Sequence, residues 1–112
     1  MAKFSQKNSN QQELSKIVEA LKAYKPEKII LFGSMLDSSK PSNDIDLFLI
    51  KKTNFDRLGE RAGEARRYLP DQRVPVDFLV YSPEEIEKEI GRGNVFLAEI
   101  LEKGKLLYDA KI

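Results

Sequence analysis

The sequence predicts a single α/β (α+β) domain, in which a small mixed sheet of three to four strands is covered by helices. Short apolar runs indicate buried strands, and longer amphipathic segments between them indicate helices. The chain has 112 residues, a length that suits one domain. We assign residues 11–112 to this domain and residues 1–10, which are polar, to a flexible N-terminal segment.

The first half of the chain predicts one helix and two strands. Apolar side chains recur at helical spacing from Leu14 to Tyr24, and Pro26 closes the pattern. The apolar run 29–32 predicts a buried strand that ends at a Gly-Ser turn. Residues 35–43 are rich in Ser, Asp, Pro and Asn, which indicates a loop. A second buried strand is expected over residues 44–50.

The second half predicts a helix over residues 55–69, a third strand over 74–81 and two further helices. In the helix predicted over residues 55–69, the buried face would carry Phe55, Leu58, Ala62, Ala65 and Leu69. The opposite face would carry Arg57, Arg61, Glu64 and Arg67. Ser82-Pro83 has the form of a helix start, and residues 91–93 (Gly-Arg-Gly) mark a break between helices. The last helix is expected over residues 94–103, and residues 105–108 could add an edge strand.

Composition excludes several kinds of site. The chain contains no cysteine and no histidine, so a bound metal must be held by oxygen, which favours Mg²⁺, Ca²⁺ or Mn²⁺. The formal net charge of +1 does not indicate nucleic-acid binding. The sequence shows no apolar run of membrane-spanning length and no signal-peptide core. We therefore expect a cytoplasmic protein.

Three carboxylates stand next to apolar strand residues. Asp44 and Asp46 are two positions apart in a predicted strand, so they share a face and lie roughly 7 Å apart along it. Asp77 interrupts the apolar run 74–81. A buried carboxylate is costly unless it is paired, and three together would favour a divalent cation. Taken singly, Asp44 could be an ordinary strand-entry residue, and Asp77 could face solvent from an edge strand.

The combination of these residues resembles the nucleotidyltransferase superfamily of DNA polymerase β and kanamycin nucleotidyltransferase. The resemblance is carried by LFGS (31–34), NDIDLFLI (43–50) and VDFLV (76–80), and it covers roughly residues 13–109. The short chain and the closing segment EILEKGKLLYD (99–109) are most similar to the minimal nucleotidyltransferase (MNT) family. Members of that family are often paired with a helical HEPN protein as toxin and antitoxin.

The resemblance implies a polymerase-β-like fold and a role for each motif residue. Asp44, Asp46 and Asp77 would be catalytic and would hold two Mg²⁺ ions, with Mn²⁺ as a substitute, while Gly33 and Ser34 would bind the nucleotide phosphates. The implied reaction transfers NMP, here expected to be AMP from ATP, to a hydroxyl group and releases pyrophosphate. The implied partners are the nucleoside triphosphate and a HEPN-type helical protein or a homodimer mate.

Two features of the sequence leave the function open. The loop after the Gly-Ser turn often contains arginines and a glycine in the family, whereas this chain has Met-Leu-Asp-Ser at 35–38. An alternative is therefore an MNT-fold binding module with little or no catalysis, which neutralises a partner by complex formation. The arginines 57, 61 and 67 could form a docking surface, although a solvated helix face is the commoner role of such residues.

Overall fold

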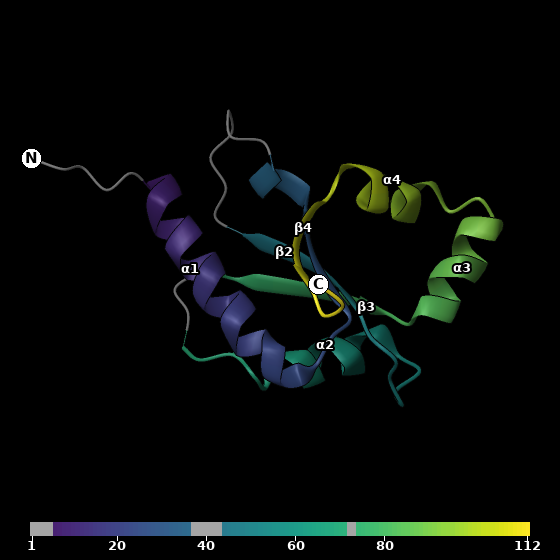
Figure 1. Cartoon of the computed structure of the whole chain (residues 1–112), viewed down its shortest axis with the longest axis horizontal. Coiled ribbons are helices and arrows are strands. Elements are labelled where there is room, and N and C mark those ends of the chain that lie inside the picture. Colours follow the sequence, from purple (N-terminus) through teal and green to yellow (C-terminus); the bar gives the residue numbers. More distant parts are fainter. Residues whose placement is uncertain (1–5, 37–43, 72–73) are drawn as a thin grey trace, which may run out of the picture.

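The computed structural model describes residues 6–36, 44–71 and 74–112 (Figure 1). Four α-helices, two short 3₁₀ helices and four strands lie within these ranges. In chain order they are α1 (Gln6–Leu21), η1 (Lys22–Tyr24), β1 (Lys28–Phe32), η2 (Gly33–Leu36), β2 (Ile45–Ile50), α2 (Leu58–Arg66), β3 (Val76–Tyr81), α3 (Pro83–Gly91), α4 (Val95–Lys103) and β4 (Lys105–Asp109). Of the helices in these ranges, none is both long enough and apolar enough to cross a bilayer.

The four strands form one mixed sheet in the order β3-β2-β1-β4. Strand β1 pairs antiparallel with both β2 and β4, whereas β2 and β3 are parallel. A parallel pair needs a crossover connection, and α2 lies in the connection between β2 and β3. The prediction of a small mixed sheet covered by helices is confirmed, and the tail segment does form an edge strand, β4.

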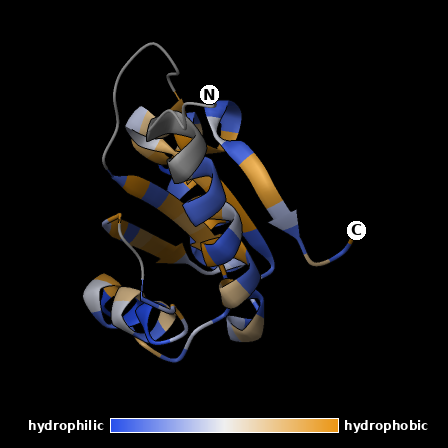
Figure 2. Cartoon of the chain, turned by 90° about the vertical axis from the view of Figure 1, so that its left-hand side faces the viewer, coloured by the Kyte–Doolittle hydropathy of each residue, from blue (hydrophilic) through white to orange (hydrophobic). Residues whose placement is uncertain are grey.

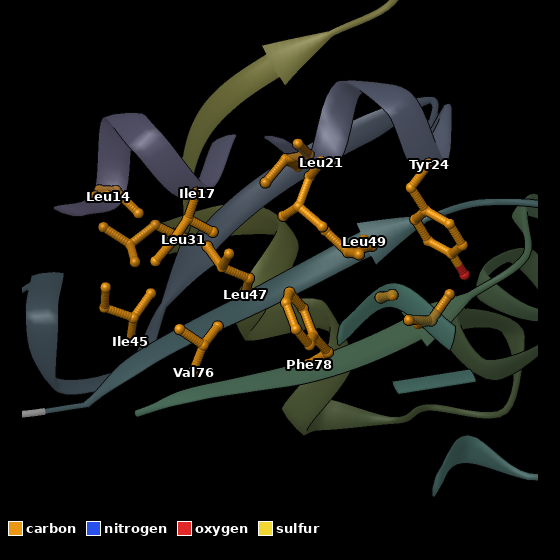
Figure 3. Close-up of a cluster of buried hydrophobic side chains, with 13 residues drawn as sticks. Leu14, Ile17, Leu21, Tyr24, Leu31, Ile45, Leu47, Leu49, Val76 and Phe78 are labelled. Carbon is orange, nitrogen blue, oxygen red and sulfur yellow. The ribbon is translucent and has the colours of Figure 1, made fainter. Parts of the chain in front are cut away.

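Helices cover both faces of the sheet, and this explains why β2 is apolar along most of its length. Successive side chains of a strand point to opposite faces. The larger core gathers side chains of α1, α2 and one sheet face, and Figure 3 shows α1 packed over these residues. The smaller core lies on the other face, where Phe48 and Ile50 of β2 meet Leu97 and Ile100 of α4. A strand buried on both faces has a nearly continuous apolar run. In Figure 2 the strands carry much of the hydrophobic colour.

The helix starts after β3 follow the sequence closely. The Ser82 hydroxyl accepts a hydrogen bond from the Glu85 backbone N–H at 3.2 Å, and the Glu85 carboxylate accepts one from the Ser82 N–H at 2.9 Å. This reciprocal capping box, with Pro83 at the first helical position, fixes the start of α3. Asn94 caps α4 by accepting a hydrogen bond from the Leu97 N–H. The predicted break between these two helices is confirmed.

Two helix predictions differ from the structure. Helix α1 begins at Gln6, well before its first apolar position, Leu14, because a helix that packs in its later turns can continue into a polar segment. Of the N-terminal segment expected to be flexible, residues 6–10 are helical and residues 1–5 lie outside the described residues. Helix α2 is shorter than predicted, and Phe55 and Leu58 are exposed. The residues that α2 buries are Arg61 and Ala65.

Candidate active site

The residue that follows β1, Gly33, lies close to the Asp46 side chain of β2, in a position that favours glycine. Gly33 has a φ of +82°, a backbone conformation that side-chain-bearing residues rarely adopt. A Cβ atom added at Gly33 would lie 2.3 Å from the Oδ2 atom of Asp46. The backbone of Gly33 therefore makes room for the Asp46 carboxylate. Ser34 follows in η2 and is exposed to solvent.

Strand register places Asp46 between β1 and Asp77. Asp46 pairs with Phe32 of β1 on one side and with Asp77 of the parallel strand β3 on the other. Paired residues of adjacent strands point to the same face of the sheet. Asp44 comes two residues before Asp46, immediately ahead of β2. The three aspartates and Gly33 thus lie at the same end of the sheet.

The electrostatic environment of Asp46 reflects this arrangement. Its side chain is half-buried, and the burial raises the pKa of its carboxyl group above the ordinary value. The negative charges of Asp77 and Asp44 raise that pKa further. Asp44 and Asp77 themselves are exposed. Asp77 faces solvent from the edge strand β3, one of the two alternatives that the sequence left open, and it still lies beside Asp46.

Known proteins resemble this chain in sequence and in fold. The sequence model of the family described as "Polymerase beta, Nucleotidyltransferase" matches residues 15–112, which is most of the chain. The chain belongs to the polymerase β nucleotidyltransferase family. A crystal structure of a candidate nucleotidyltransferase from Sulfolobus solfataricus has a similar fold, with a TM-score of 0.62 and 19% identity. The match covers 99% of this chain and 94% of that one. A search of curated proteins found no match.

The nucleotidyltransferase family implies a divalent cation, and the donor set of this chain fits one in chemistry and charge. Carboxylate oxygens suit Mg²⁺. Burial, and after it the negative charges of Asp77 and Asp44, raise the pKa of Asp46, and a cation would compensate the charge of these carboxylates. Within residues 6–36, 44–71 and 74–112, however, no three acidic side chains already form a ready set of ligands. The backbone brings Asp44, Asp46 and Asp77 to one end of the sheet, and their side chains would still have to gather around the ion.

Arg61 is the largest correction to the sequence-based prediction for this nucleotidyltransferase domain. We expected it on an exposed arginine face, but its side chain is only 5% exposed. Its guanidinium donates two hydrogen bonds to the Glu85 carboxylate, at 2.7 and 2.8 Å, and further ones to the carbonyl oxygens of Phe55 and Val80. Arg61 therefore joins α2, β3 and α3 and cannot dock a partner. Arg57 and Arg67 are exposed.

A cavity that no sequence pattern indicated adjoins Gly33. It has a volume of about 310 Å³ and lies between η2 and α4. Its lining residues are Phe32, Gly33, Leu36, Phe96, Glu99, Ile100, Lys103 and Gly104. A second cavity, of about 400 Å³, is lined by residues that include Ile50, at the opposite end of β2 from Asp46. The lining residues come from segments distant in sequence, so no local pattern could have shown either cavity.

Proposed function

We propose that this protein is an Mg²⁺-dependent nucleotidyltransferase that transfers AMP from ATP to a hydroxyl group of a partner protein. The observation that carries the proposal is the register of β2 with its two neighbours. It sets Asp46 beside Asp77, and the Asp46 carboxylate lies so close to Gly33 that an added Cβ atom would be 2.3 Å from its Oδ2 atom. The residues of three separate sequence motifs are thereby placed at one end of the sheet.

Each residue of this group has a definite task in the proposed reaction. Asp44, Asp46 and Asp77 would hold the metal, as two Mg²⁺ ions or Mn²⁺ in their place. When bound, the metal would neutralise charge on the triphosphate and lower the pKa of the acceptor hydroxyl. The exposed Ser34 hydroxyl can donate a hydrogen bond to a phosphate oxygen. Asp77, which is exposed, can accept the proton of the acceptor.

The reaction itself is a substitution at phosphorus. The acceptor oxygen forms a bond to the α-phosphorus of ATP, and the bond between that phosphorus and the oxygen bridging to the β-phosphate breaks. The proton of the hydroxyl leaves as the new bond forms, and pyrophosphate departs with the electrons of the broken bond. The acceptor gains one AMP group.

The proposed acceptor is a hydroxyl of a HEPN-type helical protein, or of a homodimer mate, with this chain as the antitoxin. Large apolar side chains remain exposed on three consecutive elements, which supports a protein partner. They include Ile90 of α3, Val95 of α4 and Leu106 of β4, which are 40%, 76% and 48% exposed. The same side chains favour a second candidate function, that of a binding module which neutralises its partner without catalysis.

Mass spectrometry distinguishes the two functions. The protein is incubated with Mg²⁺, ATP and the product of the neighbouring gene, and the masses of both proteins are measured. Addition of one or more AMP groups, lost in the Asp44→Asn and Asp46→Asn variants, would establish the transferase. A tight complex that forms without any added mass and persists in both variants would instead establish the binding module.

A further inference from the structure

We propose that the cavity between η2 and α4 binds the nucleoside part of the nucleoside triphosphate, with the base against Phe96. The inference rests on the proposed function and adds to it the place of the base and sugar. The volume of about 310 Å³ lies at the lower end of the range of roughly 300–1,000 Å³ for small-molecule sites. Its position and its walls both support a nucleoside as the occupant.

The position of the cavity supports a nucleoside as its occupant because one residue both lines the cavity and lies against Asp46. Gly33 lines the cavity, and its backbone is in close contact with the Asp46 carboxylate. Phe32, also in the lining, is the direct strand partner of Asp46. A ligand in the cavity would therefore have its phosphate chain directed past Gly33 towards the aspartates.

The walls support it because they combine an exposed aromatic ring with charged groups. Phe96 packs edge-on against Phe32, with ring centroids 6.2 Å apart and planes at 82°. Phe96 is nevertheless 60% exposed, an unfavourable state for a large apolar ring that a stacked base would relieve. Glu99 and Lys103 lie three and seven positions further along α4, on the same helix face. They can bond to the polar edge of a base or to the sugar hydroxyls.

The larger second cavity fits this role less well. Its lining contains no aromatic side chain, and it opens beside Ile50, at the far end of β2 from the aspartates. A nucleoside bound there could not place its α-phosphate at Asp46, because Ile50 lies four residues beyond Asp46 along β2, at a distance of roughly 13 Å.

The absence of tryptophan from the chain allows a direct spectroscopic test. Two full-length variants are made, Phe96→Trp and Val95→Trp. Val95 is the matched control, because it is the neighbouring residue on α4, is 76% exposed and does not line the cavity. Each variant is titrated with ATP and Mg²⁺ while tryptophan fluorescence is recorded. We expect a saturable change for the tryptophan at position 96 and none for the one at position 95.

A third variant measures the contribution of the ring. Calorimetric titration with ATP and Mg²⁺ should show binding weakened roughly tenfold in Phe96→Ala and unchanged in Val95→Ala, since stacking on one aromatic ring commonly contributes this much. Inorganic tripolyphosphate, which lacks a base, should bind Phe96→Ala as well as it binds the unmodified protein.

The remaining outcomes separate this inference from the proposed function. If ATP binds the unmodified protein and Phe96→Ala equally, and binding is lost in Asp46→Asn, the nucleoside lies elsewhere and the proposed transferase survives. If no nucleoside triphosphate binds the unmodified protein in Mg²⁺, both proposals are overturned.

Discussion

Two carboxylates of this protein lie in opposite electrostatic environments. Glu85 receives two hydrogen bonds from the buried guanidinium of Arg61, which lower the pKa of its carboxyl group to about 2. Asp46 lies half-buried beside Asp77 and Asp44, and its pKa is raised by burial and by their negative charges. The fold therefore stabilises the charged form of the Glu85 carboxylate, whereas it destabilises the charged form of the Asp46 carboxylate.

The difference separates a structural acid from a candidate functional one. An ion pair with a buried partner joins α2 to α3, and its geometry satisfies both charges. Like charges gathered at one end of a sheet oppose folding unless a ligand compensates them, and such unfavourable groupings are typical of active sites. The two regions should therefore respond differently to the same kinds of substitution.

The largest effect should follow removal of one charge at the acidic end. Asp46→Asn should lower the rate of AMP transfer on the order of 10³-fold, since a bound metal contributes several kcal/mol to transition-state stabilisation. The rate is measured as pyrophosphate released in the presence of the acceptor protein. Glu87→Gln removes an exposed carboxylate of α3 and should leave the rate unchanged. Equal rates in all three proteins would contradict a catalytic role for Asp46.

The next largest effect should come from the ion pair and should concern stability. Arg61→Ala leaves Glu85 without its cation and removes the hydrogen bonds that Arg61 donates to the Phe55 and Val80 carbonyl oxygens. We expect a loss of about 3 kcal/mol in the free energy of unfolding, near the lower end for a broken buried pair because Glu85 is partly exposed. Urea denaturation measures it. Arg67→Ala, at an exposed arginine of the same segment, should change stability by less than about 0.5 kcal/mol.

Substitutions at two glycines can separate the effect of the contact between Gly33 and Asp46 from the effect of backbone strain. Gly33 and Gly93 have the same φ of +82°, but an added Cβ meets Asp46 only at Gly33 and meets no atom within 4 Å at Gly93. Both Gly→Ala variants should lose roughly 1–2 kcal/mol of stability from backbone strain. Gly33→Ala alone should also reduce transfer, on the order of 100-fold, because it displaces a catalytic carboxylate. Equal transfer rates of the two variants would show that the contact between Gly33 and Asp46 does not matter for catalysis.

The smallest effect is the pH dependence of the Arg61–Glu85 pair. The pKa of Glu85 is lowered from 4.5 to about 2 on folding, so its contribution to stability is present above pH 4.5 and is lost as the pH falls towards 2. Because the carboxylate is 40% exposed, solvent screening limits this contribution to about 1 kcal/mol. The stability difference between the protein and Glu85→Gln, measured by denaturation at each pH, should shrink on acidification. A constant difference would argue against the pair.

Some residues of the candidate site could be predicted from sequence because their signals are local. Gly33-Ser34 ends an apolar run, and Asp44 and Asp46 begin the next one. Ser82, Pro83 and Glu85 likewise form a capping box whose spacing is fixed within one helical turn. Arg61 could not be predicted in the same way, since periodicity assigns a charged residue to the exposed face and only a distant partner can reverse that assignment.

The order of the elements, the apolar strands and the family resemblance could all be predicted from the amino-acid sequence, because they depend on spacing along the chain. Which residues come into contact depends on the folded structure. Strand register sets Asp46 beside Asp77, the position of the Asp46 side chain favours glycine at position 33, and the packing of α4 near η2 forms the cavity at Phe96. Such contacts join residues far apart in sequence, so they follow from the summed packing of the whole domain and not from any local pattern.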